Sequence, residues 1–142
     1  MNLVVTPKKL SGTLVVPSSK SAGHRDLICA ALADGKSLVK NITPSEDLEA
    51  TCLQKFGATV ETVAHEDGRR TVAVTGGLSS QTSPLKVDCG ESGSTVRFLI
   101  PVGLLTGREI TYTGRGRLPE RPLDPFFKIF DNKKIAYTKG KD

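Results

Sequence analysis

PSSKSAGHRDLICAAL at residues 17–32 predicts an α-helix that begins inside a serine-rich, basic segment. Four apolar residues recur at the spacing of one helical face: Leu27, Ile28, Ala31 and Leu32. Asp34-Gly35 carries the chemistry of a helix end. The stretch therefore defines a helix whose first turn is polar and positively charged and whose body faces a core.

The pattern around this helix predicts a mixed α/β chain. Short strands are expected at residues 3–5 and 13–16 before it and at 37–42 after it. A second helix should begin at Thr43-Pro44-Ser45-Glu46, a capping-box sequence, and bury Leu48, Cys52, Leu53 and Phe56. Strands at about 59–63 and 71–75 follow, and His65-Glu66-Asp67-Gly68 between them has the composition of a hairpin turn.

The second half of the chain repeats this order of elements. A strand is expected at residues 85–89, followed by a helix that Pro101 should kink. The apolar face of this helix carries Val96, Leu99, Ile100, Gly103 and Leu104, and a strand at 109–113 follows. Another helix should begin at Pro122 and bury Leu123, Phe126, Phe127 and Phe130, before a strand at 135–138. Arg97 follows Arg25 by 72 residues and Phe130 follows Phe56 by 74, which indicates an internal duplication of about 70 residues. Because the last strand of the second unit is missing, we expect a truncated unit.

Composition restricts the class of protein. The chain has 142 residues with a net charge of +5, so anionic partners are favoured, although a solvated basic surface explains that charge equally well. The N-terminus lacks the apolar run of a signal peptide, and no stretch approaches the roughly 20 apolar residues that span a bilayer. The absence of Trp argues against a base-stacking surface for nucleic acid.

The three cysteines predict neither a metal site nor a redox pair. Cys29, Cys52 and Cys89 form no CxxC motif, which fits a reducing, cytoplasmic location. We expect Cys29 and Cys52 to be core residues and Cys89 to be a packed small side chain. His24 and His65 have no partner at metal-ligand spacing, so neither is expected to bind a metal.

Three basic loops lie next to expected helix starts. The first, PSSKSAGHR, combines small residues with Lys20, Ser21 and Arg25, which suits an anion at a helix N-terminus. The second, GESGSTVR at residues 90–97, offers Gly93 for close backbone approach and Ser92 or Ser94 as a cap. The third, GRGRLPERP at 114–122, places three arginines within seven residues. Taken singly, each loop can also be a capped helix start or a solvated basic loop.

In this order and at these separations, PSSKSAGHR, GESGSTVRF and LPERPLD resemble the signatures of the EPSP synthase family of enolpyruvyl transferases. The resemblance covers essentially the whole chain. It implies an α/β (α+β) fold of repeated βαβαββ units, here about two with the second incomplete. Residues 1–16 would be strands that pack with the other domain of the enzyme, and 17–142 a partial N-terminal domain with units at about 17–78 and 79–142.

The resemblance also implies a reaction and a site. Family members transfer the enolpyruvyl group of phosphoenolpyruvate to the 5-hydroxyl of shikimate 3-phosphate and release phosphate, in the pathway to chorismate and the aromatic amino acids. Lys20, Ser21 and Arg25 would hold shikimate 3-phosphate, whereas Lys20, Gly93 and Arg121 would bind phosphoenolpyruvate. The resemblance implies that the reaction needs no metal and no organic cofactor. The acid and base groups would lie beyond Asp142, so no catalytic residue is expected in this chain. We expect it to be inactive alone and, with an unpaired sheet edge, to self-associate.

Two positions depart from the family pattern. Glu91 stands where many members carry Asn, and Phe98 where many carry Pro. A carboxylate at 91 would repel anionic substrates unless a cation neutralises it. Arg97 is expected to support the loop structurally.

Two alternatives stay open. The related UDP-N-acetylglucosamine enolpyruvyl transferase carries a lysine-asparagine pair in its first loop and a cysteine near its third, unlike Lys20-Ser21 and the cysteine-free 114–122 here. A non-catalytic module that binds anions or nucleic acid would instead show salt-dependent, sequence-indifferent binding.

Overall fold

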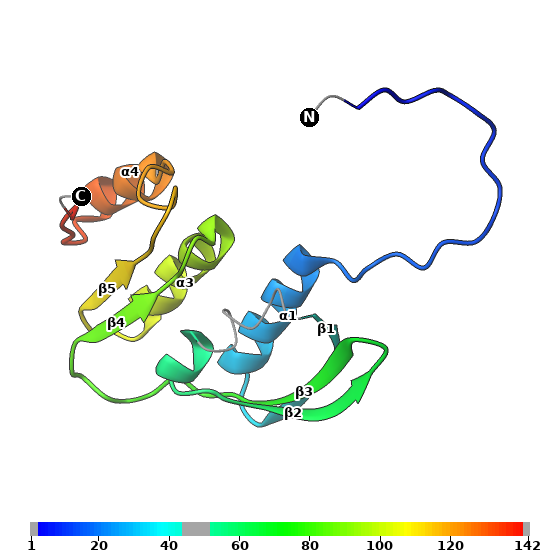
Figure 1. Ribbon diagram of the computed structural model, residues 1–142. Helices are drawn as coiled ribbons and strands as arrows, with labels where there is room; N and C mark the ends of the chain where they lie inside the picture. Colours follow the sequence, from blue (N-terminus) through cyan, green and yellow to red (C-terminus); the bar gives the residue numbers. More distant parts are fainter. Residues whose placement is uncertain (1–2, 44–51, 141–142) are drawn as a thin grey trace.

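The computed structural model describes residues 3–43 and 52–140. Figure 1 shows how its helices and strands are arranged. In chain order they are α1 (Lys20–Leu32), β1 (Lys36–Ile42), β2 (Thr59–Glu66), β3 (Arg69–Thr75), β4 (Leu85–Asp88), α3 (Gly93–Leu105), β5 (Ile110–Thr113) and α4 (Asp124–Lys133). Residues 52–55 add a helical turn before β2. The predicted helix start at residues 43–46 falls largely outside the described residues.

The first unit is an antiparallel sheet with α1 packed against it. Its strand order is β1-β3-β2, and β2 and β3 form a hairpin in which Glu66 pairs with Arg69. Asp67 and Gly68 between them have φ angles of 49° and 72°, the left-handed values that a tight two-residue hairpin turn requires. Val74 on the central strand is fully buried, and α1 contacts β1 and β3. The predicted hairpin is therefore confirmed, with strands longer than expected.

The second unit contains a parallel strand pair joined through a helix. β4 and β5 pair from Leu85 with Ile110 to Asp88 with Thr113, and α3 connects them. The helix runs through Pro101, as expected, and ends at Leu105. Gly103 leaves room for the Tyr112 ring, and the Tyr112 hydroxyl donates a hydrogen bond to the Leu99 carbonyl at 2.7 Å. This bond ties the middle of α3 to β5.

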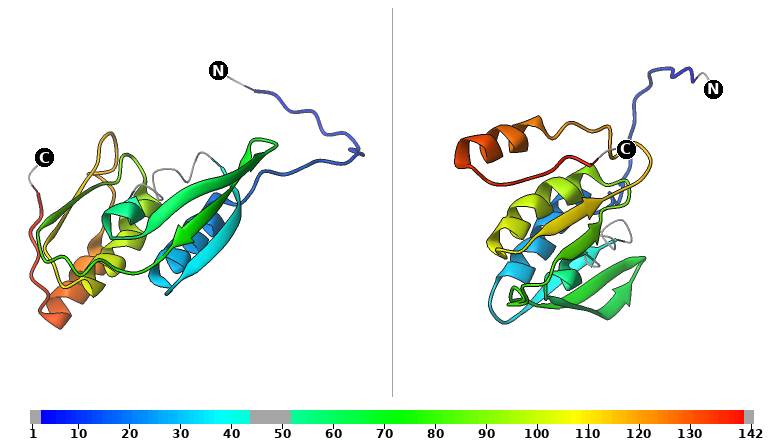
Figure 2. Two further views of the ribbon diagram at one scale, coloured as in Figure 1. Left: turned by 90° about the horizontal axis from the view of Figure 1, so that it is seen from below. Right: turned by 90° about the vertical axis from the view of Figure 1, so that its left-hand side faces the viewer.

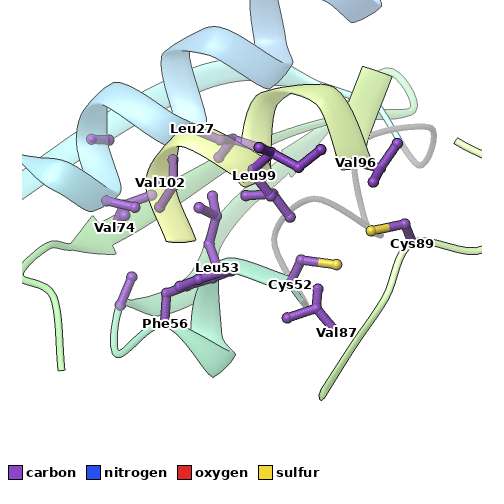
Figure 3. Packing of buried hydrophobic residues seen from close by; sticks show 14 of the residues in the cluster. Leu27, Cys52, Leu53, Phe56, Val74, Val87, Cys89, Val96, Leu99 and Val102 are labelled. Atoms are coloured by element: carbon purple, nitrogen blue, oxygen red, sulfur yellow. The ribbon is translucent and has the colours of Figure 1, made fainter. Parts of the chain in front are cut away.

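One hydrophobic cluster joins the two units. Leu27 of α1, Val74 of β3, Phe56, Val87 of β4 and Leu99 of α3 are all at most 1% exposed and belong to the same cluster. Figure 3 shows α1 and α3 next to each other across these side chains. Burial of apolar surface therefore holds the two helices in a common frame, which positions the loops that precede them.

The cysteines differ from one another in burial. Cys52 and Cys89 are 1% and 0% exposed, as predicted. Cys29 is exposed, so the prediction that it is a core residue is wrong. The face of α1 that meets the core carries Leu27, Ala30 and Ala31, and the adjacent Cys29 points away from it.

The predicted strands at residues 3–5 and 13–16 do not form. Residues 3–16 have no regular structure, and Leu3, Val4, Val5, Leu10, Leu14, Val15 and Val16 are between 65% and 89% exposed. Figures 1 and 2 show this arm leaving the rest of the molecule. A β-strand needs a neighbouring strand for its backbone hydrogen bonds, and among residues 3–43 and 52–140 no strand pairs with the arm. Arg69 Nη2 donates a hydrogen bond to the Val16 carbonyl at 3.0 Å, where the arm joins the rest of the chain.

The C-terminal end also differs from the prediction. The strand expected at 135–138 does not form, because this segment folds back along α4, where Tyr137 stacks on Phe127 with ring centroids 5.2 Å apart. α4 begins at Asp124, not at Pro122, and Pro125 occupies its first turn. The aromatic side chains of α4 therefore pack against this returning segment and not against a further strand.

A candidate anion-binding site at the helix starts

Both long helices begin with a serine cap at the same end of the molecule. The Ser19 hydroxyl accepts a hydrogen bond from Ala22 N at 3.3 Å, and the Ser92 hydroxyl accepts one from Thr95 N at 3.2 Å. Figure 1 shows the two helices starting on the same side and running in a similar direction. The positive ends of two helix dipoles therefore face one region, which favours negative charge there.

The second basic loop is held by its own hydrogen bonds. Gly90 adopts a φ of 54°, and its N–H donates to Asp88 Oδ1 at 2.9 Å. Thr95 Oγ1 donates to Ser92 Oγ at 2.7 Å, and Ser92 Oγ lies 3.1 Å from Ser94 Oγ. Of the two serines proposed as a cap, the structure uses Ser92. The loop enters α3 in a defined conformation as a result.

Gly93 lies against two arginines. A Cβ atom placed on Gly93 would lie 2.7 Å from Arg97 Nη1 and 2.8 Å from Arg121 Nη1, distances that real Cβ atoms avoid. Glycine at this position therefore lets the two guanidinium groups approach the first turn of α3. Of the residues predicted for phosphoenolpyruvate, the structure brings Gly93 and Arg121 together.

Arg97 connects the second loop to the third. Its Nη1 donates to the Gly93 carbonyl and its Nη2 to the Pro122 carbonyl, both at 3.0 Å. The neighbouring backbone bond from Arg115 N to the Gly90 carbonyl, at 2.8 Å, adds a second link. The expected structural role of Arg97 is confirmed by these bonds.

The Glu91 carboxylate is turned toward the third loop. A Cβ atom on Gly116, whose φ is 60°, would lie 2.5 Å from Glu91 Oε1. Glu91 is exposed, and the residue that its carboxylate approaches, Gly116, lies between Arg115 and Arg117 in the sequence. The Glu91 carboxylate is therefore directed toward the third loop, whose sequence carries three arginines.

The first loop meets α3 through Arg25. The Arg25 Cζ lies over the Phe98 ring, 4.9 Å from its centroid, and Arg25 Nη1 donates to the Ser21 carbonyl at 2.7 Å. The buried His24 ring contacts Phe98 edge-on, with centroids 6.5 Å apart. Lys20 and Ser21 form the exposed first residues of α1. The predicted residues for shikimate 3-phosphate thus share the first turn and a half of one helix, adjacent to α3.

The sequence did not predict the aromatic contacts between α1 and α3. Phe98 was noted only as a departure from a pattern, yet it touches both His24 and Arg25. No local sequence signal predicts that contact, because Phe98 lies 73 residues from Arg25 and the packing of α1 on α3 brings them together. Tyr112 was also missed; burial raises the pKa of its hydroxyl, which suits its structural bond to Leu99.

The described residues offer little to hold a metal and no membrane span. No three His, Cys, Asp or Glu side chains within 3–43 and 52–140 gather closely enough to hold a metal ion. In the same part of the chain, no helix has the length and apolarity needed to cross a membrane.

The fold and this cluster define a mixed α/β protein whose basic loops gather where its helices begin. The chain belongs to the EPSP synthase (3-phosphoshikimate 1-carboxyvinyltransferase) family, because the model of that family matches residues 4–138. This confirms the family expected from the three loop motifs.

Individual relatives agree with that assignment. The 3-phosphoshikimate 1-carboxyvinyltransferase of Clostridium acetobutylicum is 43% identical over 141 residues, covering 97% of this chain and 32% of the relative. That of Clostridium kluyveri is 43% identical over 135 residues, covering 94% and 30%. Two structures of EPSP synthase from Acinetobacter baumannii superpose with TM-scores of 0.67 and 0.65 at 24% and 25% identity, covering 92% and 85% of this chain and 31% and 27% of theirs. The chain spans about a third of the length of the curated relatives it matches.

Proposed function

We propose that this chain supplies the N-terminal half-site of an enolpyruvyl transferase acting on phosphoenolpyruvate and shikimate 3-phosphate. The observation that carries the proposal is the contact of Gly93 with Arg97 and Arg121 at the start of α3, the helix on which Arg25 of α1 meets Phe98. Arginine guanidinium groups at a helix N-terminus suit phosphate and carboxylate oxygens, and both substrates carry such groups.

The residues divide into two groups in this proposal. Lys20, Ser21 and Arg25 hold shikimate 3-phosphate, whose phosphate meets the start of α1. Gly93 and Arg121, with Lys20 between the two substrates, hold phosphoenolpyruvate at the start of α3. These groups bind and neutralise charge; they do not supply the acid and base that the addition of the 5-hydroxyl and the loss of phosphate require.

The proposal also assigns a role to each part of the chain. The arm at residues 1–16 is assigned to contact the remainder of the enzyme, and 17–78 and 79–142 are assigned as two related units. The equivalent serine caps at Ser19 and Ser92 support the repeat. Cys29, Cys52 and Cys89 carry thiols and form no disulfide within the described residues, which suits a reducing compartment and supports a cytoplasmic location.

Binding is tested on the isolated chain by following backbone amides by NMR. Because half of the site is open to water, we expect a dissociation constant on the order of millimolar for each substrate. Arg25→Ala should weaken binding of shikimate 3-phosphate more than that of phosphoenolpyruvate, and Arg121→Ala should do the reverse. Lys128→Ala, an exposed change on α4, is the matched control and should alter neither. Equal losses for both ligands in both variants would contradict the division of the site.

Activity is tested by phosphate release. We expect none from the isolated chain above background, and release that depends on shikimate 3-phosphate once the part of the Clostridium acetobutylicum relative that this chain does not match is added as a separate chain. UDP-N-acetylglucosamine in place of shikimate 3-phosphate tests the related transferase. Release by the isolated chain would overturn the view that its catalytic machinery is incomplete.

Self-association follows from the exposed arm. Its apolar side chains lie in an extended segment without a neighbouring strand, which favours pairing with another chain. Sedimentation should show association that rises with concentration, and deletion of residues 3–16 should reduce it. A strict monomer at high concentration would count against this part of the proposal.

A further inference from the structure

We propose that Phe98 is a positioning residue for the shikimate 3-phosphate site, because its ring holds the Arg25 guanidinium in a binding orientation. The inference rests on the function proposed above and adds a residue to that site. It starts from one contact, the Arg25 Cζ over the Phe98 ring at 4.9 Å from the centroid. This distance is within the range in which an aromatic face attracts a cation.

A second contact fixes the direction of the Arg25 side chain. Its Nη1 donates to the Ser21 carbonyl at 2.7 Å, four residues back along α1, so the guanidinium folds toward the start of the helix. Phe98 then limits its movement from the α3 side. Two restraints from two helices act on one side chain that is otherwise exposed.

The restraint leaves the binding capacity of Arg25 in place. Within the described residues, the guanidinium donates only to the Ser21 carbonyl, so most of its five N–H groups are available to an anion. A guanidinium that lies over the face of an aromatic ring keeps its N–H groups, which point outward in the guanidinium plane, available as hydrogen-bond donors. A side chain that is already oriented loses less rotamer freedom when a phosphate binds, which raises affinity.

The ring itself is held in place. Phe98 is partly buried on α3, and the buried His24 ring meets it edge-on with centroids 6.5 Å apart. His24 precedes Arg25 on α1, so the same helix that presents the guanidinium also supports the ring beneath it. The contact is therefore part of the packing between α1 and α3 and not a chance meeting of surface side chains.

The first test measures the contact without ligand. The Nε–Hε resonance of Arg25 should show an upfield ring-current shift in the unaltered chain and in Phe98→Tyr, and should lose it in Phe98→Leu. If Phe98→Leu does not fold, Phe98→Met, which keeps apolar volume without a ring, takes its place. An Arg25 resonance that is identical with and without the ring would overturn the proposal.

The second test measures binding of shikimate 3-phosphate to the 142-residue chain by NMR titration. Phe98→Leu should raise the dissociation constant about two- to fivefold, the loss expected for an exposed cation–π contact. Phe98→Tyr should stay within about twofold of the unaltered chain, as should Phe126→Leu, a control on α4 outside the contact.

The decisive comparison places Phe98→Leu in a chain that already carries Arg25→Ala. If Phe98 acts through Arg25, the second change should have no further effect on the dissociation constant. A purely structural role would weaken binding by the same factor in both backgrounds, and that result would overturn the proposal. Binding that depends on Arg25 but not on Phe98 would refute the positioning role alone. No binding by the unaltered chain, or binding indifferent to Arg25→Ala, would refute the proposed site and this inference together.

Discussion

Arg97→Ala should destabilise the chain more than any other arginine change in the basic loops. Arg97 is partly buried and bridges two carbonyls, those of Gly93 and Pro122, at 3.0 Å each. The partly buried bond to Gly93 from a charged donor contributes about 1.5 kcal/mol, and the exposed bond to Pro122 about 0.5 kcal/mol. The expected loss is therefore about 2 kcal/mol, or a fall of about 6 °C in Tm for a chain of this size.

Thermal and urea unfolding followed by circular dichroism measure this loss. Arg97→Lys should recover less than half of it, because one ammonium group cannot reproduce the fork that reaches two carbonyls. Arg117→Ala is the matched control: Arg117 is exposed in the third loop and has no side-chain partner among the described residues, so the change should stay within about 0.5 kcal/mol. Equal losses for Arg97→Ala and Arg117→Ala, or full recovery with lysine, would refute the bridging role.

Three further changes test the fold. Burial raises the pKa of Tyr112, so the stability contributed by its neutral hydroxyl is present below about pH 10, the range of a free tyrosine, and is lost as the pH rises above it. Tyr112→Phe should remove this alkaline loss of stability from unfolding experiments at a series of pH values, and a loss that persists in the variant would have another origin. Gly116→Ala should lower the free energy of unfolding by about 1–2 kcal/mol, because the φ angle of Gly116 is 60° and the new Cβ would meet Glu91 Oε1. Adding Glu91→Ala should recover only the part of this loss that is due to the steric clash, and complete recovery would exclude backbone strain. Val74→Ala, at a fully buried position on the central strand, should lower the free energy of unfolding in urea by about 2.5 kcal/mol, whereas Val63→Ala, at an exposed position, should lower it by less than about 0.5 kcal/mol.

Local sequence patterns predicted the elements whose stabilising contacts are close in the chain. The start of α1 follows from Ser19 as its cap, and the β2–β3 hairpin follows from Asp67-Gly68. The core residues Leu27 and Leu99 follow from helical periodicity. In each case the physical cause, a cap, a turn or an apolar face, acts over a few residues, so it can be recognised without the fold.

The predictions failed where a segment depends on a distant partner. Residues 13–16 are rich in β-branched side chains, as strands are, but a strand forms only beside another one. A strand was also predicted at Ile135–Thr138, but Tyr137 packs against aromatic rings of α4 and the segment folds back along that helix. Cys29 lies one residue from the buried face of α1, a difference that only the packing direction of the helix decides.

The amino-acid sequence by itself determined the family and the identity of the basic loops, because these depend on residue types at set spacings. Only the tertiary structure decided which charged groups meet. Arg121 reaches Gly93, Glu91 turns to Gly116, and Arg25 lies over Phe98 because one shared core orients α1, α3 and the third loop together. The physical reason is that side-chain contacts between distant residues depend on the direction in which whole helices pack, and that direction is set by the apolar surface that all of them bury.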